Sequence, residues 1–354
     1  MLHVVWPGDP SGVVTQVAGL VRAAAGSSPL TQRICFLAGL GETADALEAE
    51  GLVVCRLGFR RGWGPLGLLR FARVLRSVRP RIVHFHWPAL GPIIVAMAVL
   101  PRSSFVWTEH HPGALFRIRR FRIFYRLFRR RFDRFVVPSE PMATCVESYG
   151  VERERIRLIP NGLTVPLRES PRPAAGIGRV VGVLTRLDRL KRVELFIDVV
   201  AELQSKGVDC VGVIVGDGRQ RPVLEEHANA LGVRDAIEFA GMRNDVVECL
   251  DRFDVFLTTT SIESFGLAVL EAMARAVPVV AMPCPGGLAE LVGRGGVLLP
   301  DREIDTAAAA VEELLMSPAP REKLGLRGRA VAAEYSLDAA LRSLDRLYTE
   351  LIEA

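Results

Sequence analysis

The chain has 354 residues, of which 49% are apolar and 24% are charged, and its net charge is +5. This length allows two domains with separate cores, and the composition excludes a disordered or fibrous protein. The longest apolar stretch, residues 87–100, contains two prolines and a glycine and is too short to span a bilayer.

The first predicted strand, His3–Trp6, begins almost at the amino terminus. No basic segment or cleavage site precedes it, so we expect no signal peptide and a cytoplasmic protein. The six cysteines are scattered without C-x-x-C spacing, which favours free thiols over a metal or redox site.

Short apolar strands alternate with helical patterns along the chain, which predicts parallel sheets covered on both faces. In the first half we expect strands at His3–Trp6, Arg33–Leu37, Val53–Arg56, Ile82–Phe85, Phe105–Thr108, Phe135–Val137 and Ile156–Ile159. In the second half we expect them at Val180–Leu184, Val211–Val215, Ala236–Phe239, Val255–Leu257, Val279–Ala281 and Gly296–Leu299. We therefore predict an α/β protein with two doubly wound, Rossmann-like domains, residues 1–165 and 179–336, joined by a linker at 161–178 that is rich in proline, glycine and arginine.

The loop Pro7–Gly12 joins the first strand to a helix expected at about Val13–Ala24. It contains glycines, as phosphate-binding loops do, but lacks the G-x-G-x-x-G pattern of dinucleotide-binding proteins. The loop alone is therefore not specific for any ligand.

Histidines lie on or just after two predicted strands of the first domain. His84 and His86 occupy alternate positions of one strand, and we interpret them as packing or acceptor-site residues. A metal site would need a third ligand, and none has suitable spacing. His110 and His111 follow the next strand, where they are either ligand-binding residues or ordinary loop residues.

Nine arginines lie between Arg117 and Arg134, within a segment, 114–135, in which phenylalanines recur at helical spacing. The phenylalanines are Phe121, Phe124, Phe128, Phe132 and Phe135. One interpretation is a surface helix whose phenylalanines dock into the core. The alternative is contact with an anionic membrane surface or a phosphorylated acceptor. Nucleic acid is disfavoured, because buried aromatic rings cannot stack on bases.

The second domain opens with a strand and a βα turn that Arg186 and Lys191 bracket. Basic residues are unfavourable at the positive end of a helix dipole, so an anionic ligand such as a diphosphate explains their presence. Lys191 is also one of only three lysines in the chain, the others being Lys206 and Lys323.

The most informative segment is Thr258–Met273, in which Glu263 and Glu271 are eight residues apart. Between them, the turn Ser264–Gly266 opens a helix, and unpaired N–H groups at a helix start can hold an anion. Carboxylates do not bind phosphate, so the two acids are better suited to hydroxyl groups on either side of it. This combination indicates a nucleotide sugar, although a βα junction with two incidental acids is the alternative.

This segment resembles the E-x7-E motif of retaining GT-B glycosyltransferases, especially glycosyltransferase family 4. The pair Arg186 and Lys191 is similar to the R-x4-K pair of that family, whereas Ser264 stands where the family usually has glycine. The resemblance implies two domains facing each other across a cleft, with the helix at 337–354 crossing back onto the first domain. It also implies transfer of a sugar from a UDP- or GDP-linked donor to a sugar, lipid-linked or small-molecule hydroxyl, without a metal or cofactor.

The same resemblance implies roles for individual residues. Glu271 would bind the ribose, Arg186 and Lys191 the diphosphate. Glu263 would bind a hydroxyl of the sugar, and His110 and Gly12 would lie near that sugar. The "GDG" and "F-x-G" junctions at Gly216–Gly218 and Phe239–Gly241 are similar to family turns, although plain turn glycines explain them equally well. The remaining expected donor contacts are Gly216, Met242, Arg243, Ser264, Phe265, Gly266 and Leu267.

Two other functions share these features. A GT-B sugar-nucleotide epimerase has the same architecture but releases UDP and needs no acceptor. A non-catalytic partner protein would bind the nucleotide sugar without turnover. The intact set of charged residues favours transfer over both.

Overall fold

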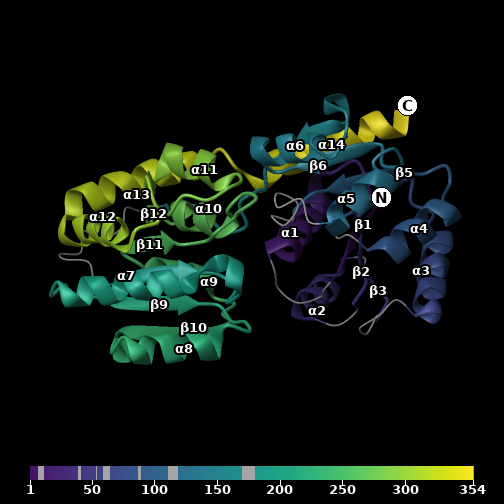
Figure 1. Ribbon diagram of the computed structural model, residues 1–354. Helices are drawn as coiled ribbons and strands as arrows, with labels where there is room; N and C mark the ends of the chain where they lie inside the picture. Colours follow the sequence, from purple (N-terminus) through teal and green to yellow (C-terminus); the bar gives the residue numbers. More distant parts are fainter. Residues whose placement is uncertain are drawn as a thin grey trace. The chain divides into compact units, whose positions relative to one another are not determined.

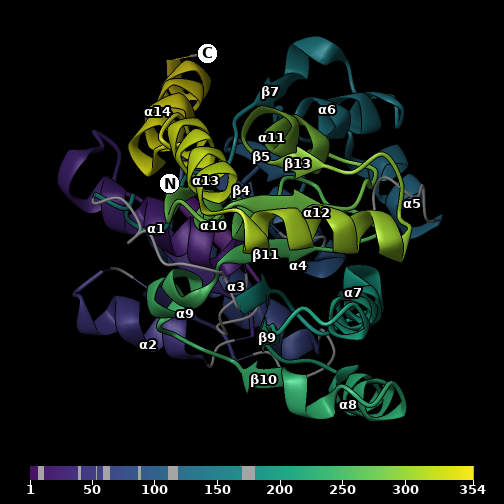
Figure 2. The same cartoon turned by 90° about the vertical axis from the view of Figure 1, so that its left-hand side faces the viewer.

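The computed structural model describes residues 1–6, 12–38, 41–52, 54–58, 64–86, 89–110, 119–169 and 180–353. The chain divides into two compact units, shown in Figures 1 and 2. Unit 1 comprises Met1–Thr164 with Ser336–Ala354, and unit 2 comprises Val165–Tyr335. The loop at 7–11 and residues 170–178 of the expected linker lie outside the described residues.

Unit 1 contains a seven-stranded parallel sheet in the order β3-β2-β1-β4-β5-β6-β7. Its strands are β1 (Leu2–Val5), β2 (Arg33–Phe36), β3 (Val54–Arg56), β4 (Ile82–Phe85), β5 (Ser104–Thr108), β6 (Arg134–Val137) and β7 (Ile156–Leu158). The strand order reverses between β1 and β4, and ligands of doubly wound sheets bind at the carboxyl end of such a switch point.

The helices of unit 1 cover both faces of this sheet. They are α1 (Gly12–Ser27), α2 (Glu42–Ala49), α3 (Pro65–Val78), α4 (Leu90–Val99), α5 (Arg119–Phe128), α6 (Glu140–Glu147) and α14 (Leu337–Glu353), with a 3-10 turn at Arg153–Arg155. Helix α14 packs beside α1. Its buried Leu341, Leu344 and Tyr348 form one cluster with Leu20 and Val106 of α1 and β5. The last helix of the chain therefore belongs to unit 1.

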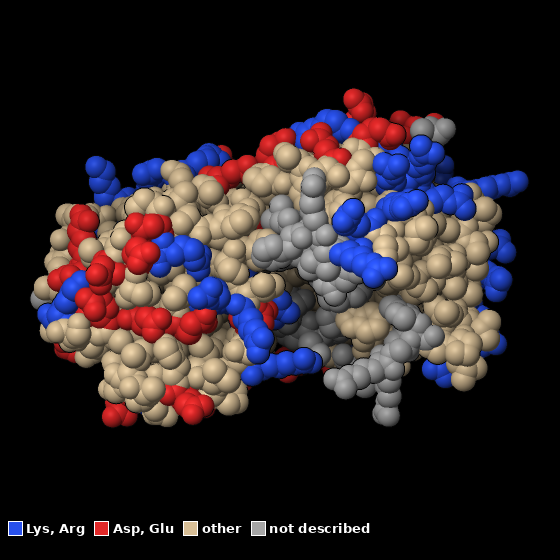
Figure 3. Space-filling model, viewed as in Figure 1, with Lys and Arg blue, Asp and Glu red and all other residues tan. Residues whose placement is uncertain are grey.

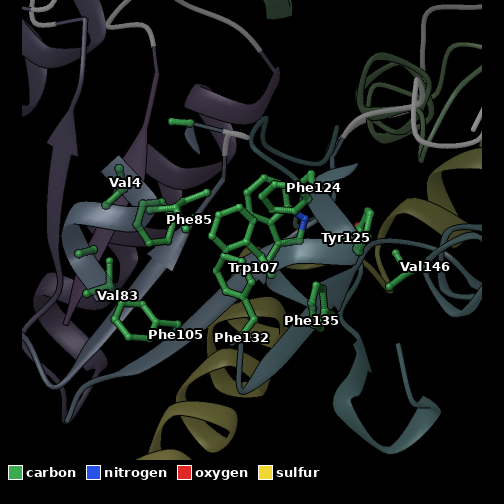
Figure 4. Close-up of a cluster of buried hydrophobic side chains, with 14 of the residues drawn as sticks. Val4, Val83, Phe85, Phe105, Trp107, Phe124, Tyr125, Phe132, Phe135 and Val146 are labelled. Atoms are coloured by element: carbon green, nitrogen blue, oxygen red, sulfur yellow. The ribbon is translucent and has the colours of Figure 1, made fainter. Parts of the chain in front are cut away.

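Aromatic side chains form the core on the opposite face (Figure 4). Trp107 is fully buried against Phe124, with ring centroids 4.6 Å apart, and against Phe132, at 5.7 Å. The expected docking of phenylalanines into the core is confirmed for Phe124, Phe128, Phe132 and Phe135.

The interpretation that one helix carries all of these phenylalanines was wrong. Helix α5 ends at Phe128, Phe132 lies in the connection that follows, and Phe135 belongs to β6. The chain leaves the helix because Asp133 is bound to β5, where its carboxylate accepts from the Phe105 N–H at 2.7 Å. The side chains of Arg120 and Phe121 lie outside the described part of the structure.

Unit 2 contains a six-stranded parallel sheet in the order β10-β9-β8-β11-β12-β13. Its strands are β8 (Val180–Leu184), β9 (Val211–Val215), β10 (Ile237–Gly241), β11 (Val255–Thr258), β12 (Val279–Ala281) and β13 (Val297–Leu298). Here the order reverses between β8 and β11, which places the switch point of this sheet between their carboxyl ends.

The helices of unit 2 are α7 (Val193–Ser205), α8 (Arg221–Ala230), α9 (Val246–Arg252), α10 (Leu267–Ala274), α11 (Leu288–Gly295), α12 (Ile304–Met316) and α13 (Pro318–Ala332), with 3-10 turns at Arg189–Lys191 and Arg234–Ala236. Helices α7, α8 and α12 contribute Phe196, Leu224 and Val311 to one buried cluster with the sheet. The predicted fold class, doubly wound parallel sheets with helices, is confirmed. None of the described helices combines the length and apolar character needed to cross a bilayer.

Candidate functional site

Two loops follow the adjacent strands β8 and β11 at the switch point of unit 2. Because both strands run in the same direction, their following loops, residues 185–192 and 259–266, emerge at one edge of the sheet. These loops carry most of the residues that the sequence singled out in this half of the chain.

Hydrogen bonds hold the two loops together. The Thr259 hydroxyl donates to the carbonyls of Lys191 at 3.2 Å and of Arg192 at 2.8 Å. The backbone N–H and the hydroxyl of Ser261 both donate to the Leu190 carbonyl, at 2.8 and 2.9 Å. The backbone around Lys191 is therefore tied to the loop that carries Glu263.

Lys191 and Glu263 form an ion pair at this edge. The Lys191 Nζ donates to Glu263 Oε2 at 2.7 Å, and the two side chains are only 22% and 19% exposed. The backbone of Glu263 is fixed as well, since its N–H donates to Pro285 O at 3.1 Å and its carbonyl accepts from Gly287 N at 2.9 Å. The sequence assigned these residues to different parts of the donor, and the structure pairs them.

Arg186 lies on the same loop but is largely exposed. Its side chain is 71% exposed and pairs with Asp188 at 3.1 Å. The Asp188 carboxylate also accepts from the Leu190 N–H at 3.0 Å and so caps the 3-10 turn. A long exposed guanidinium on the same loop as a partly buried ammonium can bind successive phosphates of one diphosphate.

Helix α10 begins directly after the loop of Glu263. Ser264 and Phe265 are buried, and the N–H of Phe265 lies 3.5 Å from Glu263 Oε1. Phe265 also packs edge-on against Tyr335, with centroids 5.6 Å apart. Glu271, half-buried, lies on α10, as the E-x7-E spacing requires.

Gly266 is required by the backbone at the start of α10. Its φ is +102°, and a Cβ here would lie 2.9 Å from Leu288 Cδ1. We expect Gly266→Ala to lower the free energy of unfolding by about 1 to 3 kcal/mol, because an alanine is strained in this conformation. Urea unfolding measures the loss, with Gly293→Ala as the control, since Gly293 has open space around its Cβ position. Equal stability of the two variants would contradict the assignment of strain.

The expected donor contacts Gly216, Met242 and Arg243 lie at or just after the ends of β9 and β10. Gly216 has φ +128°, and a Cβ on it would lie 1.9 Å from the Thr185 carbonyl oxygen. Packing therefore explains this glycine without a ligand. Met242 is 57% exposed, and Arg243 pairs with Asp245. Neither residue is brought into contact with Lys191 or Glu263 by a described hydrogen bond.

Arg302 supports the site and was missed by the sequence analysis. Its guanidinium donates to the carbonyls of Thr260 at 2.9 Å, Pro283 at 2.9 Å and Thr259 at 2.6 Å. Through these hydrogen bonds Arg302 holds together the loops after β11 and β12. Burial of the guanidinium is the main cause that lowers the pKa of Arg302. No motif marks a lone arginine of this kind, because its role depends on which loops the sheet order makes neighbours.

In unit 1, the residues expected near the sugar lie at the carboxyl edge of the sheet. His110 follows β5, and Gly12 is the first residue of α1. His111 and the loop before Gly12 lie outside the described residues. His110 Nε2 lies 3.0 Å from His86 Nδ1, which connects the edge to the interior.

A third buried histidine joins the two that the sequence placed on one strand. The parallel register of β1 and β4 pairs His3 with His84, and His3 Nδ1 lies 3.0 Å from His86 Nε2. The expectation that no third histidine accompanies His84 and His86 was therefore wrong, because sheet order rather than sequence spacing brings His3 in. The nitrogens of these three residues lie within 4.8 Å of one another, as a metal site would require.

Each nitrogen of these three rings already has a hydrogen-bond partner. His3 Nε2 lies 3.0 Å from Gln32 Oε1. The two nitrogens of His84 lie 2.7 Å from the Tyr348 hydroxyl and 2.6 Å from the Thr108 hydroxyl. The hydrogen bonds account for the cluster, and a metal would have to break several of them.

Burial of these histidines predicts a loss of stability on acidification. Desolvation lowers the pKa of His3 from 6.5 to about 4 and those of His84 and His86 well below 6.5. Between pH 4 and 6.5 these histidines bind more protons in the unfolded chain than in the folded one. The free energy of unfolding therefore rises with pH across this window, by up to about 1.4 kcal/mol per pH unit for each histidine.

Urea unfolding at pH 7.5 and pH 5 measures this dependence. We expect a lower midpoint at pH 5 than at pH 7.5. Equal midpoints at both pH values would contradict neutral burial of the cluster.

The comparisons with known proteins cover almost the whole chain. Residues 10–165 match the family model Glycosyltransferase Family 4, and residues 172–331 match Glycosyl transferases group 1. An alpha-D-kanosaminyltransferase of Streptomyces kanamyceticus is 33% identical over 49% of this chain and 46% of its own length. A D-inositol 3-phosphate glycosyltransferase of Corynebacterium urealyticum is 31% identical over 59% and 54%. The chain thus spans about half the length of these curated relatives.

Solved structures match over the full length. HepE of Anabaena, solved in complex with UDP and glucose, superimposes with a TM-score of 0.84 at 20% identity, over 98% of each chain. Sucrose-phosphate synthase of Thermosynechococcus elongatus superimposes with a TM-score of 0.80 at 18% identity, over 99% of this chain and 98% of the other. At this identity the likeness shows the fold.

Proposed function

Since the chain belongs to the family 4, or group 1, glycosyltransferases of GT-B fold, we propose that it transfers a sugar from a nucleoside-diphosphate sugar to an acceptor hydroxyl with retention of configuration. The observation that carries this proposal is the Lys191–Glu263 pair at the switch point of unit 2. A cation for a phosphate and a carboxylate for a sugar hydroxyl lie within one hydrogen bond of each other there.

The charges suit the departure of a nucleoside diphosphate. As the bond from the sugar to the diphosphate breaks, negative charge grows on the phosphate and positive charge on the sugar ring. Lys191 and Arg186 would stabilise the first, and the Glu263 carboxylate would hold a hydroxyl of the second. These cations supply the charge neutralisation, so we expect turnover to continue in the presence of a metal chelator.

The remaining donor contacts follow from the start of α10. The N–H groups of Phe265, Gly266 and Leu267 surround the positive end of that helix and would hold a phosphate or sugar oxygen, beside the Ser264 hydroxyl. Glu271 would accept the ribose hydroxyls. From unit 1, the family resemblance assigns His110 and Gly12 to the transferred sugar.

UDP-sugars are the first donors to test, with GDP-sugars second. HepE has been solved with UDP-glucose, and the curated relatives include an alpha-D-kanosaminyltransferase and D-inositol 3-phosphate glycosyltransferases. The acceptor would be a hydroxyl of a sugar, a lipid-linked sugar or a small molecule.

The test is a transfer assay with a panel of acceptors. The protein is incubated with UDP- and GDP-sugars and each acceptor, and nucleotide release and the anomeric configuration of the product are followed by NMR. Acceptor-dependent release with a retained α-linkage supports the proposal. Release of UDP with an epimerised free sugar, or binding without any turnover over the whole panel, contradicts it.

For localisation, we propose that helix α5 contacts an anionic membrane surface. Its inner face is buried through Phe124 and Phe128, whereas Ile123 and Leu127 are 45% and 59% exposed. Arg122 and Arg126 are exposed beside them. Figure 3 shows basic side chains gathered over the part of unit 1 where α5 is drawn in Figure 1. Apolar side chains flanked by arginines suit the interface of an acidic bilayer.

Cosedimentation with vesicles tests this contact. We expect the protein to pellet with phosphatidylglycerol vesicles and not with phosphatidylcholine vesicles. Arg122→Glu with Arg126→Glu should abolish the binding. The exposed pair Arg219→Glu with Arg346→Glu changes the net charge equally and should not. Equal loss in both double variants would mean that net charge, and not α5, drives the association.

A further inference from the structure

Three histidines of unit 1 form a continuous chain of hydrogen bonds. His3 Nδ1 lies 3.0 Å from His86 Nε2, and His86 Nδ1 lies 3.0 Å from His110 Nε2. His3 and His86 are 0% and 3% exposed, whereas His110 reaches the carboxyl edge of the sheet. We call His3, His86 and His110 the imidazole chain.

The inner end of the imidazole chain is anchored by a carboxylate of α14. His3 Nε2 lies 3.0 Å from Gln32 Oε1, and Gln32 Nε2 donates to Asp345 Oδ1 at 3.2 Å. The hydroxyl of Ser28 donates to the same Asp345 oxygen at 2.9 Å. Because a carboxylate only accepts, the Gln32 amide must turn its NH2 group to Asp345 and its oxygen to His3.

This orientation fixes the direction of every bond that follows. A neutral imidazole has one N–H and one acceptor nitrogen, and buried imidazoles are neutral. Since Gln32 Oε1 accepts, His3 carries its proton on Nε2 and accepts on Nδ1. His86 must then donate from Nε2 and accept on Nδ1, and His110 must donate from Nε2.

His84 packs against the imidazole chain but takes no part in its hydrogen bonds. Its ring lies 4.1 Å from that of His86, centroid to centroid. Its own nitrogens are bound to Tyr348 and Thr108 at 2.7 and 2.6 Å. Hydroxyl groups both donate and accept, so these contacts do not oppose the direction set by Asp345.

We propose that Asp345, acting through Gln32 and the imidazole chain, holds the proton of His110 on Nε2 and leaves Nδ1 as an acceptor nitrogen. Asp345 and Gln32 are thus positioning residues, set in α14 and before β2. If the proposed function holds, Nδ1 accepts a hydrogen bond from a hydroxyl of the bound sugar, and this last clause alone depends on that function.

The tautomer of His110 can be measured without any substrate. In protein labelled with 15N-histidine, the two-bond and three-bond correlations of each ring distinguish protonated from unprotonated nitrogens, and His110→Gln assigns the signal. We expect His110 protonated on Nε2 only, at pH 7.5. A proton on Nδ1, on both nitrogens, or a mixture of tautomers in the unaltered protein would overturn the proposal.

Two variants test whether the anchor sets the tautomer. Gln32→Leu removes the acceptor for His3, and Asp345→Asn allows the Gln32 amide to adopt either orientation. Both should convert His110 into a mixture of tautomers, whereas the exposed Asp338→Asn on the same helix should not. If Gln32→Leu does not fold, the tautomers measured in Asp345→Asn and in the unaltered protein still test the proposal. A single Nε2-H tautomer retained in the variants would overturn the proposal.

Kinetics separate the positioning role from a structural one. In an active enzyme, Gln32→Leu should lower kcat about tenfold or more, because a His110 with the wrong tautomer cannot accept the hydroxyl, with little change in KM for the donor. An unchanged kcat with a mixed tautomer would overturn the link to the sugar. Absence of any turnover in the unaltered protein, with the expected tautomer present, would count against the proposed function and not against the role of the imidazole chain.

Discussion

Replacing Lys191 by alanine should lower kcat by about a hundredfold or more, as expected on losing a charge that stabilises the transition state. The ammonium lies 2.7 Å from Glu263 Oε2 and is only 22% exposed, so water screens it poorly. When the donor binds, the same ammonium would turn to the diphosphate, where negative charge grows during departure. Initial rates at saturating donor measure the loss.

Lys206→Ala is the matched control for this prediction. Lys206 also pairs with a glutamate, Glu202 at 3.0 Å, but it lies at the far end of α7 and is more exposed. It should keep full activity. Arg186→Ala should show a loss of the same order as Lys191→Ala, because in the proposed complex both cations would face one leaving group. Near-normal kcat in either cation variant, with the fold intact, would refute the assignment.

Replacing Glu263 by glutamine should lower kcat by about a hundredfold while leaving the affinity for UDP unchanged or higher. The amide keeps the size of the side chain but loses the charge that would face the positive sugar ring. Because Lys191 then loses its carboxylate partner, it becomes more available to the diphosphate. Turnover and UDP binding are measured on the same preparation.

This contrast separates the two halves of the ion pair. Lys191→Ala should weaken both UDP binding and turnover, whereas Glu263→Gln should affect turnover alone. Glu313→Gln, an exposed carboxylate on α12, is the control and should change neither. If Glu263→Gln reduced UDP binding as strongly as it reduced turnover, Glu263 would be acting on the nucleotide and not on the sugar.

The fold was predictable because strands buried on both faces are continuously apolar. For this reason the sequence predicts strands at Val180–Leu184 and Val211–Val215. The helical segments between the strands imply that they pair in parallel. The end of α5 was not predictable. Its phenylalanine spacing continues into Phe132 and Phe135, whereas the contact of Asp133 with β5 that ends the helix is a tertiary one.

The site was predictable to the extent that residues lie within one loop. The spacing of Arg186 and Lys191 and that of Glu263 and Glu271 mark two βα turns, and their assigned roles stay predictions. Their pairing across neighbouring strands depends on sheet order, which spacing does not encode. His3 was missed for the same reason, since its contact with His86 follows from the register of β1 and β4.

Calorimetric titration with UDP and GDP, with and without magnesium, tests the central claim most directly. The claim is that the β8 and β11 loops of unit 2 hold a nucleoside diphosphate through Lys191. We expect one nucleotide to bind with micromolar affinity, unchanged by magnesium, lost in Lys191→Ala and retained in Lys206→Ala. No binding of either nucleotide, or equal binding by the Lys191→Ala variant, would contradict it.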